Sequence, residues 1–296
     1  MGKIGLNKLP DWDKLLRKEL YFYKKIFIEF YLHTKENLEE FGMQRILFFD
    51  CFSGISGDMT VGALLDLGID QEQFLNEMKK LQVDGYKLEI KKSTKKGITG
   101  TDFHVILTHH HHDDEDHHHH DHRNLHDVER IIDESELKDH VKVMSKKIFR
   151  LVAEAEAKIH GKPLEEVHFH EVGAMDSIVD IVGTAICMDL LEVDEVYASP
   201  LHVGTGFVHC AHGVFPVPAP ATLEILKGVP VYNKGIETEL VTPTGAAIVK
   251  AFSDGFGDIP AMEIHKIGYG LGKKDLEIPN VLRVCLGEKK TKKIVL

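Results

Sequence analysis

The order of hydrophobic and polar residues along the chain predicts both helices and strands. Apolar residues recur at helical spacing in several segments, and short apolar runs between them indicate strands. The predicted helices cover 11–41, 58–81, 124–134, 137–161, 175–191, 219–227 and 243–253. The predicted strands cover 45–50, 86–92, 101–108, 194–199, 229–233, 261–267 and 280–286. The elements alternate without a regular βαβ period, which indicates an α/β or α+β fold with a mixed sheet flanked by helices.

The same pattern suggests how the chain is divided. With 296 residues it is long enough for one or two domains. We expect an amphipathic helical extension at 1–42, which is either a docking helix or the product of an upstream start codon, because a self-sufficient domain begins at Met43. The remaining divisions are an N-terminal α/β subdomain at 43–108, a disordered loop at 109–126, a helical and α/β region at 127–287 and a basic tail at 288–296.

Charge and cysteine usage narrow the class of protein. The formal net charge of −11 argues against broad binding to nucleic acid or to an anionic membrane. The four cysteines are scattered without a CxxC pair, as expected for reduced thiols in the cytoplasm. No segment resembles a transmembrane helix or a signal peptide. We therefore expect a cytoplasmic globular protein without nucleic-acid or membrane partners.

The segment from His168 to Asp180 concentrates polar chemistry. His168, His170, Glu171 and Asp176 precede Asp180, which is four residues beyond Asp176 and so shares one face of a helix with it. Imidazole and carboxylate are both good ligands for divalent first-row metals, so these five residues are predicted to hold a metal. Asp180 lies one turn into an apolar helix, where an unpaired carboxylate is unfavourable.

A structural explanation of this segment remains open. Asp176 could be a helix N-cap that follows the turn at Gly173, and His168 could be a surface histidine. Capping does not explain Asp180, because that residue is a full turn inside the predicted helix.

A second cluster of histidines lies in the middle of the chain. The stretch 109–126 contains ten histidines and five acidic residues, and it has no apolar periodicity, so we expect a disordered loop. Its metal-ligand candidates are His109, His110, His111, His112, His117, His118, His119 and His120. Several imidazoles on a flexible loop bind Ni²⁺, Cu²⁺ or Zn²⁺, which indicates metal capture or buffering. The alternative is a solvated loop with adventitious metal affinity.

Two glycine-containing helix starts are candidates for binding an anion. A strand followed by small residues and a helix forms the first, and a threonine cap followed by proline forms the second. The candidate residues are Ser53, Gly54, Ser56, Gly57, Asp58, Thr242, Thr244 and Gly245. Asp50 and Asp58 could also hold a metal or a ribose hydroxyl. An ordinary tight turn and ordinary helix caps, with Asp58 as one of them, explain both segments equally well.

Weaker signals lie further along the chain. His202, His209 and His212 occur among glycines, and His209 and His212 are candidates for a metal or substrate site. We also expect a turn at 268–272 to form one wall of a pocket with His265.

Taken together, several motifs resemble one known family. They are Ile46-Leu-Phe-Phe-Asp-Cys-Phe-Ser-Gly-Ile-Ser-Gly-Asp-Met59, the histidine-rich loop, His168-Phe-His-Glu-Val-Gly-Ala-Met-Asp-Ser-Ile-Val-Asp180, Val241-Thr-Pro-Thr-Gly-Ala246 and Lys266-Ile-Gly-Tyr-Gly-Leu-Gly272. From about Met43 to Val284 the chain resembles the LarC-type nickel insertion family, the pyridinium-3,5-bisthiocarboxylic acid mononucleotide nickel chelatases of lactate racemase cofactor synthesis.

The resemblance implies an enzyme that inserts Ni²⁺ into this mononucleotide and uses CTP with Mg²⁺ or Mn²⁺. His170, Glu171 and Asp180 are then candidates for accepting the displaced carbon-bound proton, by position alone. Family members continue into a C-terminal region associated with nucleotide binding, so the nucleotide site is expected outside this chain, in a separately encoded region. The other implied partner is a racemase-type apoenzyme that receives the cofactor, and we expect a homo-oligomer.

Two other functions are compatible with the same residues. One is a nickel storage or delivery protein without catalysis, and the other is a metal-dependent hydrolase of a phosphorylated small molecule. Nickel transfer, nickel retention and phosphate release would distinguish the three.

Overall fold

The structure is a computed structural model that describes residues 20–21, 23–29, 41–108, 123–167, 169, 175–210 and 213–292. The chain divides into two compact units, one of Met1–Met43 with Lys290–Leu296 and the other of Gln44–Lys289. In the first unit, Leu20, Tyr21 and residues 23–29 are helical, as the amphipathic pattern predicts.

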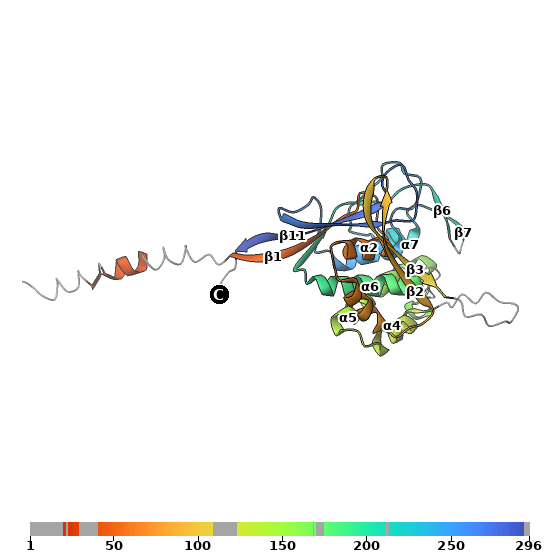
Figure 1. The fold of residues 1–296 in the computed structure, drawn as a ribbon, viewed down its shortest axis with the longest axis horizontal. Coiled ribbons are helices and arrows are strands. Elements are labelled where there is room, and N and C mark those ends of the chain that lie inside the picture. Colours follow the sequence, from red (N-terminus) through yellow and green to blue (C-terminus); the bar gives the residue numbers. More distant parts are fainter. Residues whose placement is uncertain are drawn as a thin grey trace, which may run out of the picture. The chain divides into compact units, whose positions relative to one another are not determined.

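The second unit contains most of the described helices and strands (Figure 1). The helices are α2 (Gly57–Asp66), α3 (Gln71–Lys79), α4 (Leu125–Glu134), α5 (Asp139–His160), α6 (Met175–Leu191), α7 (Pro220–Ile225) and α8 (Pro243–Phe252), with a short 3₁₀ turn at Leu164–Glu166. The strands are β1 (Phe41–Asp50), β2 (Tyr86–Lys95), β3 (Ile98–Leu107), β4 (Glu195–Ala198), β5 (Leu201–His202), β6 (Phe207–Cys210), β7 (Gly213–Pro216), β8 (Val231–Tyr232), β9 (Gly255–Phe256), β10 (Glu263–Leu271) and β11 (Val281–Lys292).

One seven-stranded sheet has the order β2-β3-β10-β11-β1-β4-β9, and β5-β8 and β6-β7 form two small sheets. β1 runs parallel to β4, and β10 is parallel to β3 but antiparallel to β11. β2 and β3 form a continuous antiparallel hairpin from the pair Tyr86–Leu107 to the pair Lys95–Ile98. The prediction of a mixed sheet flanked by helices is confirmed, and segments 43–108 and 127–287 both contribute strands to it.

Helix α2 lies directly on β3 and β10 because glycines remove the side chains between them. A Cβ atom at Gly270 would lie 1.8 Å from the carbonyl oxygen of Met59, and one at Gly268 would lie 2.2 Å from that of Ala63. The prediction of a turn at 268–272 is therefore wrong, since β10 continues to Leu271. These glycines permit a close helix–strand contact rather than a change of chain direction.

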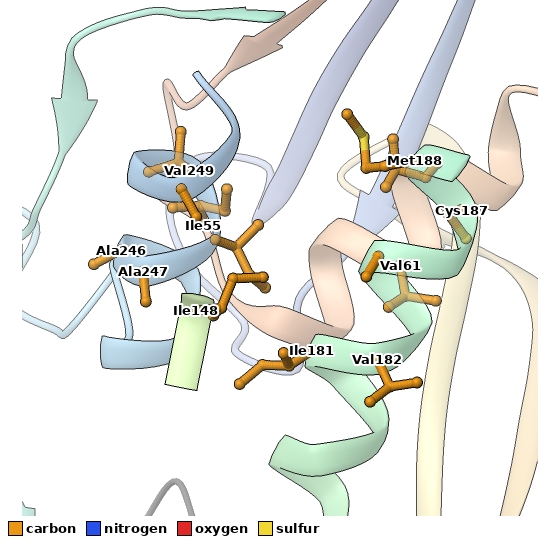
Figure 2. Close-up of a cluster of buried hydrophobic side chains, with 14 of the residues drawn as sticks. Ile55, Val61, Ile148, Ile181, Val182, Cys187, Met188, Ala246, Ala247 and Val249 are labelled. Atoms are coloured by element: carbon orange, nitrogen blue, oxygen red, sulfur yellow. The ribbon is translucent and has the colours of Figure 1, made fainter. Parts of the chain in front are cut away.

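The core lies where α2, α5, α6 and α8 meet. Figure 2 shows Val61 of α2, Ile148 of α5, Ile181 and Val182 of α6 and Val249 of α8 within one cluster of apolar side chains. All five of these side chains are fully buried. This packing fixes α2, α6 and α8 relative to one another, and so it also fixes the positions of their first turns.

Most predicted elements are found with small shifts at their ends. The helix at 175–191 has the predicted bounds, α4 begins one residue later than predicted and ends at the predicted residue, and α5 is shorter by two residues at its start and one at its end. The prediction of a single helix at 58–81 is wrong, because this segment forms two helices, α2 and α3. Gly68, with a φ of +93°, separates them, and the Asp70 side chain caps α3 by accepting a hydrogen bond from the Gln73 backbone N–H.

Within the described part of the chain, no helix is both long and apolar enough to span a membrane.

Candidate functional site

A cavity of about 390 Å³ lies where the first turns of α2, α6 and α8 come together. Its lining residues are Ser56, Gly57, Asp58, His104, Val105, Asp176, Ser177, Asp180, Glu239, Thr242, Pro243, Thr244 and Lys273. The volume is within the range typical of small-molecule sites. Positions far apart in the sequence therefore meet at one concave surface.

The first turn of α2 places a carboxylate on the cavity wall. Ser56 is the N-cap, but its side chain does not bond to a helix N–H. Instead the Ser56 hydroxyl donates to Oδ1 of Asp58, which also accepts from the Met59 backbone N–H at 2.8 Å. Asp58 is thus the second residue of the helix, not its cap, and its charge is favourable beside the helix N-terminus.

Asp180 places a buried carboxylate on the cavity wall. Its Oδ1 atom is buried and has no hydrogen-bond partner among the described residues. Gly57 lies against it so closely that a Cβ there would be 2.5 Å from Oδ2 of Asp180. Burial raises the pKa of Asp180 well above its usual value, and the charges of Asp58 and Asp176 raise it further, although Lys273 and the Asp58 backbone N–H oppose the rise.

Lys273 is the cation on the cavity wall. Its ammonium donates to Oδ1 of Asp102 at 2.7 Å and to the carbonyl of Phe103 at 2.9 Å, and lies 3.7 Å from Oδ2 of Asp58. Two acceptors on β3 therefore hold it beside the acidic group. Its single positive charge offsets only part of the charge of Asp58, Asp176 and Asp180.

The remaining two helix starts differ in their chemistry. In α6, Oδ1 of Asp176 accepts from the Ser177 backbone N–H at 2.8 Å, and Asp176 is the second residue of the helix rather than its N-cap. In α8, the Thr242 hydroxyl caps the helix by accepting from the Gly245 N–H at 3.1 Å, with Pro243 in the first turn as predicted.

Three titratable lining residues, His104, Glu239 and Lys273, were missed by sequence reasoning. Lys273 and Glu239 lie in loops, and the exposed His104 lies on β3, five residues before the histidine-rich stretch. No local motif marks them, because only the pairing of β3 with β10 and the position of α8 bring them to the cavity.

Many predicted metal ligands lie outside the described residues. This group comprises His168, His170, Glu171, His109, His110, His111, His112, His117, His118, His119 and His120. Within the described ranges, no three histidine, cysteine or carboxylate side chains are close enough together to hold an ion by themselves. Asp176 and Asp180 lie on one cavity wall, and Glu171 is only five positions before Asp176 in the sequence.

Other predicted polar residues have different surroundings. Ser53 and Gly54 do not line the cavity, and the Gly54 and Ile55 backbone N–H groups bond to the carbonyls of Cys51 and Leu240. Asp50 pairs with the Arg283 guanidinium, away from Asp58. The buried His202 is fully bonded, because its Nδ1 contacts the Phe52 carbonyl at 3.0 Å and its Nε2 accepts from the Lys234 N–H at 3.1 Å. His209 is exposed, and His212 lies outside the described residues.

Comparison with known proteins identifies the family of the chain. Residues 47–296 match the model of the nickel insertion protein family. The chain belongs to the nickel insertion protein family. A putative nickel insertion protein of Dictyoglomus thermophilum is 55% identical over 244 residues, which cover 82% of this chain and 61% of that relative.

Two further relatives carry a more specific name. Proteins of Acetivibrio thermocellus and Clostridium kluyveri, each named pyridinium-3,5-bisthiocarboxylic acid mononucleotide nickel insertion protein, are 55% and 54% identical to this family member. The alignments cover 84% and 82% of this chain. The chain thus spans about three fifths of the length of these relatives, at 61% and 62%. No solved structure matches it at a significant level.

Proposed function

We propose that this chain inserts Ni²⁺ into pyridinium-3,5-bisthiocarboxylic acid mononucleotide, and that the cavity is where the ion meets the organic substrate. Family membership and the names of the relatives support nickel insertion. The observation that carries the assignment of the site is the buried, unpartnered Oδ1 of Asp180 on the cavity wall. A carboxylate in that position gains a partner when a cation binds beside it.

In this proposal, Asp176 and Asp180 supply oxygen ligands from the cavity wall, and His168, His170 and Glu171 supply the rest. Mixed imidazole and carboxylate ligation binds nickel less tightly than a thiolate cage, so it suits an ion that must be passed on. Because burial raises the pKa of Asp180 and a metal ligand must be deprotonated, Ni²⁺ competes with protons at this carboxylate, and nickel binding should strengthen as pH rises.

Formation of the nickel–carbon bond displaces a proton from the pyridinium ring. His170, Glu171 and Asp180 are the proposed acceptors, because they lie within one short stretch of sequence that ends on the cavity wall. The histidine-rich stretch from His109 to His120 is proposed to collect the ion before transfer. CTP, with Mg²⁺ or Mn²⁺, is proposed to act through a region outside this chain, and a racemase-type apoenzyme is proposed as the recipient of the product.

Nickel transfer in solution tests the proposal. The chain, together with a separately produced C-terminal region, is incubated with the mononucleotide, Ni²⁺ and CTP, and the product mass is measured. A mass gain corresponding to nickel is expected for the wild type. Asp180→Asn should abolish most of it, whereas Asp189→Asn should not. Asp189 is the matched control, because it lies on the same helix but outside the cavity, where Lys138 pairs with it at 2.7 Å.

The other outcomes select the alternatives. Nickel that stays on the protein without any mass gain of the mononucleotide would contradict insertion and favour storage or delivery. Release of phosphate from the mononucleotide without nickel incorporation would favour a hydrolase.

A further inference from the structure

The three helix starts at the cavity differ in charge. The first turn of α2 contains Asp58 and that of α6 contains Asp176, so each brings its own carboxylate to the positive end of the helix. The first turn of α8 contains no acidic residue, and its cap, Thr242, is neutral. The start of α8 is therefore the one of the three whose positive end is not matched by an anionic side chain of its own.

Thr244, in the first turn of α8, has a side chain that can bind a ligand in the cavity. Its residue is 7% exposed, it lines the cavity, and its side chain has no hydrogen-bond partner among the described residues. The hydroxyl oxygen is not among the fully enclosed side-chain atoms without a partner, so it remains accessible although most of the residue is buried. Since the hydroxyl belongs to a cavity-lining residue, a ligand in the cavity is the partner that the fold leaves room for.

The backbone of the same turn offers one further donor. Pro243 has no N–H, and the Gly245 N–H is already given to the Thr242 hydroxyl. The first turn of a helix leaves its N–H groups without acceptors inside the helix. Thr244 therefore presents both its backbone N–H and its hydroxyl, which together suit an oxyanion.

We propose that the first turn of α8 binds the phosphate group of the mononucleotide, with Thr244 donating from its hydroxyl and its backbone N–H. This inference rests on the proposed function, because it takes the mononucleotide as the substrate. It divides the cavity into a phosphate part at α8 and a metal part at Asp176 and Asp180. Thr244 then sets specificity for the phosphorylated form over the nucleoside.

The charges around the cavity make the two parts interdependent. Among the lining residues that the structure describes, four have carboxylates, Asp58, Asp176, Asp180 and Glu239, and one has an ammonium, Lys273. The carboxylates disfavour an anion until a cation neutralises part of their charge. Ni²⁺ should therefore increase phosphate affinity, and the mononucleotide should increase nickel affinity by the same factor.

Binding of a pyridinium mononucleotide without CTP or transfer tests the phosphate subsite. The probes are nicotinic acid mononucleotide and its riboside, which lacks only the phosphate, measured by calorimetry on the full chain with and without Ni²⁺. The wild type should prefer the mononucleotide, and Thr244→Val should weaken its binding about 10- to 100-fold, as expected for hydrogen bonds to a charged group. Binding of the riboside should stay unchanged.

Two variants control for packing. Thr244→Ser keeps the hydroxyl and should restore most of the affinity for the mononucleotide. Thr222→Val is the matched control, because Thr222 is a fully buried threonine near the start of α7, also lacks a hydrogen-bond partner in the described structure, and does not line the cavity. It should bind both probes as the wild type does.

Equal binding of the two probes by the wild type would overturn the subsite, even if Thr244→Val did not fold. So would a Thr244→Val protein that loses both probes equally, because the contact would then not be to the phosphate. Failure of the proposed function looks different, since the wild type would bind the mononucleotide in preference to the riboside and yet transfer no nickel. In the transfer assay itself, Thr244→Val should raise KM for the mononucleotide while kcat stays near the wild-type value.

Discussion

Two groups of helix ends in the Gln44–Lys289 unit differ in how their charges are matched. At the C-terminal ends of α4, α7 and α8, single lysines from neighbouring elements bond to the last carbonyls. Lys142 donates to Ser135 O at 2.7 Å after α4, Lys250 to Ile225 O at 2.6 Å at the end of α7, and Lys147 to Ala251 O at 2.6 Å in the last turn of α8. Each cation is favourable beside the negative end of a helix. These ends are electrostatically complete.

Where the first turns of α2 and α6 meet at the cavity, like charges are crowded together. Asp58 and Asp176 raise the pKa of Asp180, and one oxygen of Asp180 has no partner in the described structure. The lysines at the C-terminal ends stabilise the fold without any ligand, whereas the buried carboxylate of Asp180 becomes favourable with a bound cation.

The largest expected effect comes from Asp180→Asn. We expect nickel transfer to fall by about 100-fold, because the substitution removes a charged ligand and a proton acceptor. Without nickel, the free energy of unfolding should rise by about 1–3 kcal/mol, because an uncharged amide is cheaper to bury than an unpartnered carboxylate. Transfer is read from product mass and stability from urea unfolding. A variant that loses both stability and transfer would show that Asp180 supports the fold, and it would break the contrast between the helix ends.

The difference in free energy of unfolding between the wild type and Asp180→Asn should depend on pH. Since the folded-state pKa of Asp180 is raised, its protonated form stabilises the fold at low pH, and that stability is lost as pH rises through the raised pKa. At low pH the wild type and Asp180→Asn should therefore have similar free energies of unfolding. As pH rises, the free energy of unfolding of the wild type should drop below that of the variant. Urea unfolding across the pH range measures this. Saturating Ni²⁺ should stabilise the wild type more than the variant.

Gly57→Ala should disturb the cavity through packing. The added Cβ would lie 2.5 Å from Oδ2 of Asp180, so we expect a loss of about 1–3 kcal/mol of unfolding free energy and weaker nickel binding. Thermal unfolding and nickel calorimetry check both. The control is Gly183→Ala on α6, where the new Cβ would have ordinary contacts, 3.4 Å from Phe74 and Val61. Equal behaviour of the two variants would mean that the Gly57–Asp180 contact is not tight.

The smallest expected effect lies at the C-terminal ends. Lys250→Met removes the ammonium that bonds to Ile225 O and Lys227 O, which should cost about 1 kcal/mol of unfolding free energy. Nickel transfer at a temperature where the protein is folded should match the wild type. A clear loss of nickel transfer in folded Lys250→Met would contradict this contrast, because a lysine at a C-terminal helix end would then contribute to function as well as to stability.

Local sequence patterns were sufficient for most of the elements and for several residues that line the cavity. The four-residue spacing of Asp176 and Asp180 within an apolar helix predicted a carboxylate facing a polar site, and α6 has the predicted bounds. The cap at Thr242 and the proline after it were also readable, because capping depends on adjacent residues.

What could not be read depends on contacts between distant segments. Lys273 reaches the cavity because it donates to Asp102 and the Phe103 carbonyl, 171 and 170 positions earlier. Asp50 is paired with Arg283, 233 positions later, which sequence reasoning could not distinguish from a ligand. Glycines at 268–272 were interpreted as a turn because a glycine for chain reversal and a glycine for close packing look alike in a single sequence.

Those strand glycines have a consequence for anyone who alters this protein. Gly268 and Gly270 set how deeply α2 rests on the sheet, and α2 in turn holds Asp58 and the glycine that touches Asp180. A methyl group at either glycine would push α2 away from the sheet, and Asp58 would move with the helix. The shape of the cavity thus also depends on two residues that do not line it. Mutagenesis restricted to the lining residues would miss them.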